Sequence, residues 1–370
     1  MHIDQLKIEN FRNIKAAQIE LAERINLFVG NNGSGKTSLL EGVHLALTGR
    51  SQRRATNEVM LRRGADYLRV AAETTVGRVR VTSEYGFTPG RVRTLKLNHN
   101  PVRSLGELLE EFAVVSFAPD DLQLVYGAPS ARRNGFDFVL STASPVYLEA
   151  LTDYQRAVAQ KNRLLKDLQK TGRAGVGGPQ LAGFNVQLVA LGVEIMKARH
   201  NYLHATAGEM RELYAQLSDN GETVAAVYEP SVADGDEDHW VAAFETALLQ
   251  NAEKERILGM ALVGPHRDDW AFYLGGRSAR QFASQGQARS LAIALKLAGF
   301  RYLERLRGET PILLFDEIFG ELDPGRGRRL LELVGSFAQA LITSVQPSSL
   351  DGLAGHAGKF QIADGAVAPL

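Results

Sequence analysis

Apolar and polar positions alternate with the period of a β-strand through much of the first hundred residues. Short runs of this kind predict strands at residues 2–9, 16–21 and 25–29. The last run ends at Gly30, a glycine-rich turn follows, and a helix is predicted from about Lys36. Three further alternating stretches lie within residues 69–98, separated by Gly77 and by Thr88-Pro89-Gly90, which is typical of an antiparallel meander. The first third of the chain is therefore expected to be rich in sheet.

The spacing of apolar residues becomes helical from about Ser144 and stays so to about Ser218, with a glycine-rich break at residues 171–179. At about 1.5 Å per residue the two helices would be about 40 Å and about 55–60 Å long, which makes a hairpin and not a long coiled coil. Residues 219–239 are acidic and are predicted to be a loop. Another helix leads into Leu258, after which strand patterns return, at residues 270–274 and 311–315.

These patterns favour an α/β fold in which a helical middle is inserted into one head domain. The head would be a mixed sheet with an antiparallel lobe, formed by residues 1–125 and 255–370. Residues 126–254 would form a helical lobe with long antiparallel helices. No repeat of fixed period is visible in the sequence, so a solenoid is not expected.

The amino-acid composition excludes some classes of function but indicates none. The chain has 370 residues, is 45% hydrophobic and carries 42 basic and 42 acidic residues, so its net charge is zero and a nucleic acid would have to bind a local basic excess. The absence of cysteine excludes disulfide scaffolds, thiolate zinc sites and cysteine nucleophiles. No run reaches the roughly 18 apolar residues that cross a bilayer, and residues 1–13 lack the apolar block of an export signal. We therefore expect a soluble, cytoplasmic protein that binds no membrane.

The turn after the third predicted strand carries a phosphate-binding pattern. Residues 30–37 fit G-x-x-x-x-G-K-[ST] between a predicted strand and a predicted helix. Glycines let backbone N–H groups surround phosphate oxygens, Lys36 would reach the β- and γ-phosphates of ATP, and the Thr37 hydroxyl would bind Mg²⁺. The alternative is a chance glycine turn with a surface lysine. The predicted ATP-binding residues here are Gly30, Asn31, Asn32, Gly33, Ser34, Gly35, Lys36, Thr37 and Ser38.

Hydrolysis of ATP also needs a carboxylate for the metal ion and a group that orients water. The apolar run 312–315 is followed directly by Asp316 and Glu317. Asp316 at the strand end would bind Mg²⁺ together with Thr37, and Glu317 would polarise the attacking water. The predicted catalytic residues are therefore Lys36, Asp316 and Glu317. Two acids after an apolar run also occur by chance, so the functional interpretation depends on their combination with the phosphate-binding turn.

A third segment indicates the class of ATPase. Ser284-Gln285-Gly286-Gln287 opens a helix rich in alanine and leucine and resembles the signature motif of ABC-type ATPases. The resemblance implies an ABC/SMC-type P-loop ATPase head, in which Ser284, Gly286 and Gln287 bind the γ-phosphate of ATP held by a second copy of the chain. One P-loop leaves one side of a triphosphate facing water, and a second helix N-terminus can close it. ATP would then join an ATP-dependent homodimer.

Two shorter segments resemble parts of the same superfamily. Glu321-Leu322-Asp323 resembles the D-loop, whose aspartate helps to couple the two sites of a dimer. Asp323 before Pro324 also suits the N-cap of a helix, and both interpretations can hold together. Asn10-Phe11-Arg12-Asn13 resembles the loop of SMC-like heads in which an arginine contacts ATP, whereas the alternative for Arg12 is a solvated side chain.

Three longer segments resemble patterns of the RecF family. They are residues 119–133 with the pair Arg132-Arg133, residues 264–269, and residues 313–330. The sequence departs from the family where Gly135 and Phe136 precede Asp137 and where Gly320 precedes Glu321. Where many ABC relatives carry a Q-loop glutamine this chain reads Ala118-Pro119-Asp120-Asp121, so Gln123 and Asp120 both stay candidates for that position. Residues 341–346 lack the switch histidine of transporter ATPases, and the role of the segment 264–269, with His266, stays open.

The RecF resemblance implies an ATP-dependent DNA-binding recombination mediator that dimerises on ATP, binds DNA at gaps and helps to load RecA together with RecO and RecR. A weak DNA-dependent ATPase activity would reset the dimer, and the protein would serve DNA repair, replication and the SOS response. The alternatives are another ABC/SMC-type ATPase, such as a transporter motor subunit, and a DNA-binding scaffold with incidental ATP hydrolysis. The missing switch histidine and the large helical insertion argue against the transporter motor.

A local excess of positive charge offers a place for DNA. Residues 50–103 contain twelve basic and four acidic residues, a difference of 12 − 4 = +8. Arginines on strands and loops contact the phosphate backbone without reading bases. The alternative is a solvated sheet face balanced by the acidic stretch 219–239. The candidate DNA contacts are Arg50, Arg53, Arg54, Arg62 and Arg63.

Overall fold

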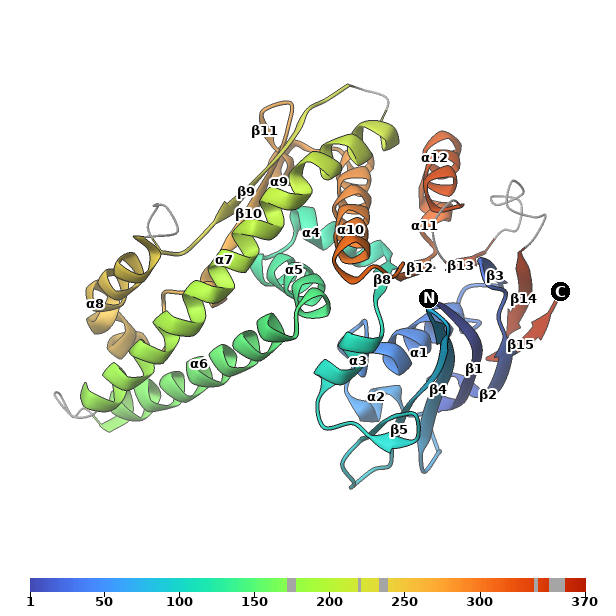
Figure 1. The fold of residues 1–370 in the computed structure, drawn as a ribbon, viewed down its shortest axis with the longest axis horizontal. Helices are drawn as coiled ribbons and strands as arrows, with labels where there is room; N and C mark the ends of the chain where they lie inside the picture. Colours follow the sequence, from blue (N-terminus) through green and yellow to red (C-terminus); the bar gives the residue numbers. More distant parts are fainter. Residues whose placement is uncertain (172–177, 219–220, 233–238, 336–338, 346–356) are drawn as a thin grey trace. The chain divides into compact units, whose positions relative to one another are not determined.

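The computed structural model describes residues 1–171, 178–218, 221–232, 239–335, 339–345 and 357–370 (Figure 1). The chain forms two compact units. We call Met1–Leu122, Glu212–Gly221 and Gln285–Leu370 the head unit, and Gln123–Arg211 and Glu222–Ser284 the helical unit. Some features singled out in the sequence lie outside the described residues: the glycines of the break at 172–177, Asp219, Asp234, Asp236, Glu237, Asp238 and Gln346.

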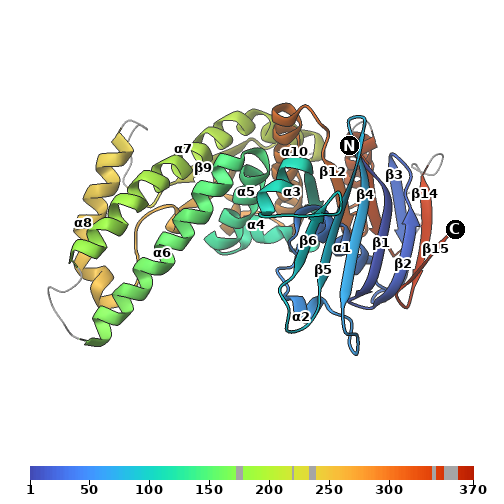
Figure 2. The same cartoon turned by 60° about the horizontal axis from the view of Figure 1, so that its bottom comes forward.

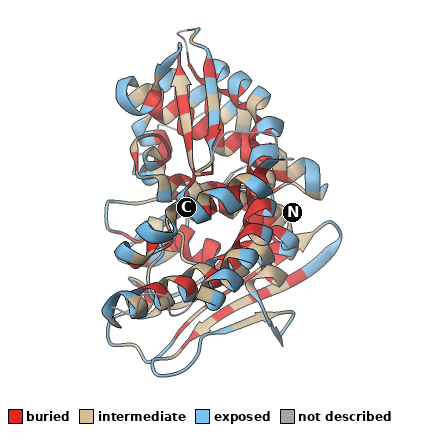
Figure 3. Cartoon of the chain, turned by 90° about the vertical axis from the view of Figure 1, so that its left-hand side faces the viewer, coloured by how far each residue is buried: buried red, intermediate tan, exposed pale blue. Residues whose placement is uncertain are grey.

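An antiparallel sheet occupies the N-terminal part of the head unit, as the alternating pattern predicted. Among the described residues it has six strands in the order β2-β1-β4-β5-β6-β7. Buried residues alternate with less buried ones along much of β1 and β5, because each strand turns one face toward the core. Figure 3 colours the chain by this burial, with buried residues in red. The strands are β1 (His2–Phe11), β2 (Ile14–Glu20), β4 (Leu68–Val76), β5 (Val79–Phe87), β6 (Thr94–Leu97) and β7 (Asn100–Pro101).

A mixed sheet forms the second layer of the head unit, in the order β15-β14-β3-β13-β12-β8 over the described residues. Its strands are parallel except β15, which runs antiparallel to β14. Every residue of β12 and β13 is buried, as expected for strands covered on both faces. The strands are β3 (Ile25–Val29), β8 (Val114–Phe117), β12 (Ile312–Asp316), β13 (Ala340–Ser344), β14 (Gly358–Ala363) and β15 (Ala366–Pro369).

The helix α1 (Lys36–Thr48) contacts strands of both sheets, so the main hydrophobic core lies around it. Leu39, Val43 and Leu47 of this helix are fully buried. Since α1 starts directly after the phosphate-binding turn, the core fixes the position of that turn. The other helices of the head unit are α2 (Asn57–Met60), α3 (Leu105–Glu111), the 3-10 turn η1 (Pro119–Leu122), α10 (Gln285–Arg307), α11 (Ile318–Glu321) and α12 (Pro324–Gly335).

The helical unit contains the two long helices that the sequence predicted. They are α6 (Pro145–Thr171) and α7 (Gly178–Leu217), which form a hairpin (Figure 2). The last residues of α7 belong to the head unit. The unit also holds α4 (Gln123–Tyr126), α5 (Pro129–Ala143), α8 (Trp240–Leu258), the 3-10 turn η3 (Pro265–Arg267) and α9 (Ala279–Phe282).

A small antiparallel sheet in the helical unit corrects the prediction of a loop over residues 219–239. Its order is β11-β10-β9, with β9 (Val224–Glu229), β10 (Asp269–Leu274) and β11 (Arg277–Ser278). Val224 and Tyr228 of β9 are buried. The acidic composition of the segment predicts a loop. The strand forms because it pairs with β10, which lies some forty residues further along the chain.

The same sheet moves a predicted boundary. The sequence assigned residues 255–370 to the head, whereas residues up to Ser284 belong to the helical unit. The reason is that β10 pairs with β9 and contacts α5. The first boundary lies after Leu122, three residues before the predicted one.

The helix α7 is long and apolar enough to cross a membrane by length and composition alone, and no other helix among the described residues is. The expectation that no segment meets this criterion was therefore wrong for α7. One such helix is weak evidence, because the core helix of a soluble protein passes the same test. Its side chains Leu188, Ile195 and Met196 are fully buried in the structure.

Candidate nucleotide-binding site

The phosphate-binding turn connects β3 to α1, as the sequence predicted. Gly33 has φ 78° and Gly35 has φ 118°, values that residues with a side chain rarely adopt. The helix begins at Lys36, so its unpaired backbone N–H groups face the turn. Backbone N–H groups at such a helix start are partly positive and can bind the oxygens of a phosphate group.

Lys36 is folded into the turn. Its Nζ donates to the carbonyl oxygens of Gly30 at 2.7 Å and Asn31 at 2.9 Å, and lies 2.9 Å from Oε1 of Glu317. The side chain of Lys36 is 2% exposed. The structure thus brings together two of the predicted catalytic residues and balances the lysine charge with the carboxylate of Glu317.

Asp316 lies at the carboxyl end of β12 and meets two hydroxyl groups. Thr37 Oγ1 donates to Asp316 Oδ1 at 2.9 Å, and Thr343 Oγ1 lies 3.0 Å from the same oxygen. Burial raises the pKa of the Asp316 carboxyl, whereas the hydrogen bonds from Thr37 and Thr343 and the charge of Arg53 act in the opposite direction. Asp316 and Thr37 are therefore close enough to share a hard cation such as Mg²⁺.

Thr343 on β13 was not predicted to belong to the site. Besides its contact with Asp316, its Oγ1 accepts the backbone N–H of Glu317 at 2.9 Å. Glu317 has φ 56°, a strained conformation for a residue with a side chain. Thr343 therefore stabilises the strained backbone of Glu317 and so helps to set the position of its side chain. No motif marks Thr343, which lies on the strand that lacks the switch histidine of transporter ATPases.

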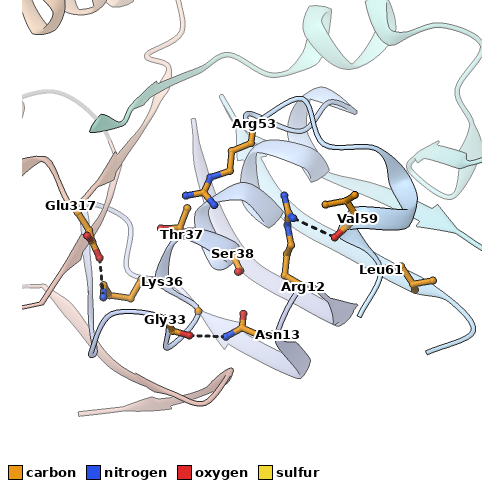
Figure 4. Close-up of a pocket in the computed structure, with 11 residues that line it drawn as sticks. Arg12, Asn13, Gly33, Lys36, Thr37, Ser38, Arg53, Val59, Leu61 and Glu317 are labelled. Carbon is orange, nitrogen blue, oxygen red and sulfur yellow. Dashed lines mark hydrogen bonds and ion pairs between the residues drawn. The ribbon is translucent and has the colours of Figure 1, made fainter. Parts of the chain in front are cut away.

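A cavity of about 530 Å³ opens beside the turn (Figure 4). Val59 and Leu61 supply apolar surface, while Arg12 and Arg53 supply positive charge from two separate segments. The lining residues include Arg12, Asn13, Gly33, Gly35, Lys36, Thr37, Ser38 and Glu317. A lining with cations, hydroxyl groups and two aliphatic side chains suits a nucleotide with its phosphates on the turn.

Arg53 was predicted to contact DNA, but it lines this nucleotide cavity. Arg12 was expected at the nucleotide, and it also lines the cavity. Arg12 is not merely solvated: its guanidinium binds Glu41 with two hydrogen bonds of 2.9 Å each and donates to the carbonyl of Val59 at 3.3 Å. The position of Arg53 could not be inferred from its basic neighbours in the sequence.

Ser34 tests whether the turn fits a phosphate. Its residue is 6% exposed, and its Oγ has no hydrogen-bond partner among the described residues. A buried hydroxyl without a partner is costly, and a phosphate oxygen on the turn would accept its hydrogen. The residues present therefore fit a nucleotide.

Known proteins share this sequence and this fold. A family described as "AAA domain" matches residues 5–121. A DNA replication and repair protein RecF of Heliobacterium modesticaldum is 36% identical over 372 residues, which cover 99% of this chain and 98% of that protein. The chain belongs to the RecF family. The RecF protein of Streptococcus pneumoniae is 33% identical over 368 residues, which cover 100% of this chain and 99% of that protein.

Solved structures agree with this membership. The recombination mediator protein RecF with ATP, from the RecFOR pathway, has a TM-score of 0.91 and 29% identity, covering 100% of this chain and 97% of that one. An Smc head bound to the C-terminal winged-helix domain of ScpA has a TM-score of 0.59 at 15% identity, which shows a common fold only. The predicted ABC/SMC-type head is therefore confirmed for this RecF-family chain.

The predicted signature segment stands at a helix start, as expected. Ser284 directly precedes α10, which begins at Gln285. A Cβ placed on Gly286 would lie 2.5 Å from Nη1 of Arg326, so Arg326 lies against the first turn of α10. Gln287 follows in the same turn. In this RecF-family chain the motif is therefore presented at a helix N-terminus.

Asp323 is the residue that precedes α12, and the N-cap interpretation holds. Its Oδ1 accepts the backbone N–H of Arg326 at 3.0 Å, and its Oδ2 lies 3.3 Å from Nε of Arg326. The backbone hydrogen bond from Arg326 lowers the pKa of the Asp323 carboxyl. Burial opposes this effect, and the charges of Arg326 and Arg329 add to the lowering. A dimer contact of Asp323 stays a prediction.

Asp121 holds the segment where a Q-loop was expected. Its carboxylate pairs with Lys296 of α10 and accepts the backbone N–H of Ala118 at 2.8 Å. Asp120 and Gln123, the two candidates for the Q-loop position, are exposed. Neither lines the nucleotide cavity. Asp121 therefore anchors this segment of the head unit to the helix that follows the signature motif.

The remaining candidate DNA contacts lie on the head unit. Arg54 and Arg63 are exposed, and Arg62 is half-buried. Partial desolvation, followed by the like charges of Arg93 and Arg54, lowers the pKa of Arg50. Mutual repulsion of cations favours an anion beside them.

The segment 264–269 is anchored in the helical unit through the buried side chain of Asp268. Asp268 is fully buried, pairs with Arg199 at 3.1 Å and accepts the backbone N–H of Ser231 at 2.7 Å. Arg199 also binds Asp137 at 2.9 Å. Burial lowers the pKa of His266 to about 4, and its Nδ1 lies 2.8 Å from the Tyr154 hydroxyl. The sequence left the role of this segment open. Its hydrogen bonds and ion pairs indicate a structural role in the helical unit.

Proposed function

We propose that this RecF-family protein is an ATP-dependent DNA-binding recombination mediator that dimerises on ATP. The observation that carries the proposal is the convergence of Lys36, Thr37, Asp316 and Glu317 at the phosphate-binding turn. The ATP complex of a RecF structure with the same fold supports ATP as the ligand.

The chain provides a holder for each part of MgATP. The turn N–H groups, Ser34 Oγ and Lys36 would bind phosphate oxygens, and Thr37 with Asp316 would bind Mg²⁺. Bound MgATP supplies the phosphoanhydride bond and the metal charge that neutralises the departing phosphate. Val59 and Leu61 offer an apolar surface for the rest of the nucleotide.

Glu317 would act only after Lys36 has moved. In the structure Lys36 Nζ holds the carboxylate of Glu317 at 2.9 Å. When Lys36 turns to phosphate oxygens, Glu317 is released and can orient a water molecule and accept its proton. Binding is thereby linked to the activation of the catalytic base, and hydrolysis is expected to be slow and to reset the dimer.

The homodimer is proposed because α10 presents Ser284, Gly286 and Gln287 at its N-terminus. This helix end can bind the γ-phosphate held by a second copy, with Asp323 coupling the two sites. Closure would bring the basic residues of both copies onto DNA, with Arg50, Arg54, Arg62 and Arg63 as phosphate contacts.

The biological setting that we propose follows from the family. The relatives are DNA replication and repair proteins, and the RecF–ATP structure belongs to the RecFOR pathway. We infer that this chain acts with RecR and RecO at gapped DNA, helps to load RecA during repair and the SOS response, and works in the cytoplasm. A scaffold with incidental ATP hydrolysis is the competing function, and it predicts DNA binding that does not depend on ATP.

The test is the molecular mass in solution, measured by light scattering with ATP, with ADP and without nucleotide. We expect a dimer with ATP only. Lys36→Ala removes the phosphate cation and should leave a monomer, whereas Lys15→Ala changes an exposed lysine of β2 and should dimerise normally. Glu317→Gln should keep the dimer with ATP and lower turnover about 100-fold.

The signature motif is tested separately. Ser284→Arg should leave ATP binding intact and block dimerisation, because the larger side chain obstructs the helix end. Gln160→Arg on α6 adds the same charge at an exposed position and is the matched control. Normal ATP-dependent dimerisation of Ser284→Arg or of Lys36→Ala would refute the proposed mechanism.

A further inference from the structure

Glu41 of α1 is a buried carboxylate for which the proposed reaction has no use. It lies five residues after Lys36 and its residue is 1% exposed. A carboxylate in such a place is costly unless cations and hydrogen-bond donors surround it. Its partners therefore indicate what the position is for.

One partner is Arg12, which lines the nucleotide cavity. Nε of Arg12 donates to Glu41 Oε2 and Nη2 donates to Oε1, each at 2.9 Å. Nη1 donates to the carbonyl of Val59. A guanidinium has five N–H groups, so two remain for a ligand while the other three hold the group in place. Glu41 thus keeps Arg12 preorganised at the cavity.

The other partner is Ser51, which builds the turn that carries Arg53. Ser51 donates its hydroxyl hydrogen to Glu41 Oε1 and accepts the backbone N–H groups of Arg53 and Ala55, each at 3.1 Å. Arg53 lines the same cavity as Arg12. One carboxylate therefore supports both arginines of the nucleotide cavity, although they belong to different segments of the chain (Figure 4).

We propose that Glu41 is a positioning residue that holds Arg12 and the Arg53 turn in place for the nucleotide. The proposal rests on the proposed nucleotide binding and adds to it a residue that does not itself touch the ligand. Its carboxylate fixes the side chain of Arg12 and, through Ser51, the backbone that carries Arg53, so the ordering of these groups does not weaken the affinity for ATP. A purely structural ion pair would affect unfolding and leave ATP affinity unchanged.

The test compares Glu41→Gln with Glu255→Gln, using a fluorescent ATP analogue and thermal unfolding. Glu255 is a matched control, since it is buried and lies 2.7 Å from Lys161 in the helical unit. Both variants should lose thermal stability. We expect the dissociation constant for ATP to rise about tenfold in Glu41→Gln and to change less than about twofold in Glu255→Gln.

A double-mutant cycle with Arg12→Ala identifies the route. If Glu41 acts through Arg12, the losses of ATP affinity in Glu41→Gln and Arg12→Ala must be clearly less than additive when combined. If Glu41→Gln does not fold, two other variants replace it. Ser51→Ala frees the backbone of the Arg53 turn, and Arg12→Lys keeps the charge but loses the paired hydrogen bonds to Glu41. Each should weaken ATP binding about threefold or more.

Three outcomes decide the matter. Wild-type affinity in folded Glu41→Gln, or in both substitute variants, refutes the positioning role and leaves the proposed function standing. Full additivity with Arg12→Ala refutes it as well. Absence of ATP binding by the wild-type protein would refute the proposed function itself, and the role of Glu41 with it.

Discussion

Thr343 shows how much of the site depends on one hydroxyl group. It contacts the carboxylate of Asp316 and the backbone N–H of Glu317, and so connects the proposed metal ligand to the proposed base. Since Glu317 has φ 56°, its position depends on such support from outside its own strand. Thr343 is a positioning residue, because nothing places it against the nucleotide itself.

We predict that Thr343→Val lowers ATP turnover about tenfold, with less than about a threefold change in ATP affinity, because the isosteric side chain removes only the hydroxyl. Thr74→Val is the matched control: Thr74 is fully buried in β4 and its hydroxyl has no partner in the described part of the chain. Single-turnover hydrolysis and nucleotide titration measure the two effects. Equal turnover in the two variants would contradict the role of Thr343.

At the scale of elements, the C-terminal hairpin β14–β15 supports the phosphate-binding turn. The backbone N–H of Gly365 in the hairpin turn donates to the carbonyl of Ser34 at 2.8 Å. In the neighbouring turn between β1 and β2, Asn13 Nδ2 donates to the carbonyl of Gly33 at 3.3 Å. Two β-turns distant in sequence therefore hold the loop, and with it the N–H groups that would bind phosphate.

Gly365→Ala should weaken ATP binding about tenfold, because a Cβ would lie 2.3 Å from the carbonyl oxygen of Asn13 and push the hairpin off the turn. Gly90→Ala provides the control, since Gly90 has φ 76° against 78° for Gly365 and no atom within 4 Å of its Cβ position. Both substitutions should cost about 1–2 kcal/mol of stability through their positive φ. Equal ATP affinity in the two variants would show that the hairpin does not support the loop.

Another element-scale feature is the polar core of the helical unit. Arg199 of α7 joins Asp137 of α5 to Asp268, which precedes β10. The pKa of Arg199 is raised: burial alone would lower it, but the charge of Asp137 and its neighbours outweighs that effect. The network fixes helices of the unit against its small sheet, which explains why a polar segment is buried there.

For the whole molecule, a net charge of zero conceals a separated distribution of charge. Part of the basic excess in residues 50–103 is neutralised by acids outside that segment, since Arg69 lies 3.4 Å from Glu9 and Arg80 lies 3.9 Å from Asp4. Of the five candidate DNA contacts, Arg53 lines the nucleotide cavity, so we propose the DNA surface on Arg50, Arg54, Arg62 and Arg63.

Charge reversal tests that surface. The double variant Arg62→Glu, Arg63→Glu should weaken DNA binding at least about tenfold and lower the slope of log affinity against log salt by about 2, because two phosphate contacts are lost. The control is Arg156→Glu, Arg163→Glu on α6, where both residues are exposed. Fluorescence anisotropy over a salt series measures both quantities. A salt-independent affinity of the wild type would exclude a phosphate-binding surface.

Local patterns in the sequence determined a large part of this protein. The strands and long helices follow from apolar periodicity, and the phosphate-binding turn with Lys36 follows from spacing, because glycines at fixed positions act within a single turn. The acids Asp316 and Glu317 were identified from the apolar strand before them. Their meeting with the turn was inferred from the superfamily pattern, and the structure shows Thr37 and Asp316, 279 residues apart, 2.9 Å from each other.

The tertiary structure alone decided the rest. Thr343, Glu41 and Gly365 carry no motif, and their roles come from neighbours brought to them by sheet pairing and helix packing. Arg53 belongs to the nucleotide cavity and not to the DNA candidates because the Ser51 turn rests on Glu41. The strand β9 needs a partner far along the chain. A local pattern can specify the conformation of a segment, but a contact between distant segments exists only once the core has placed both.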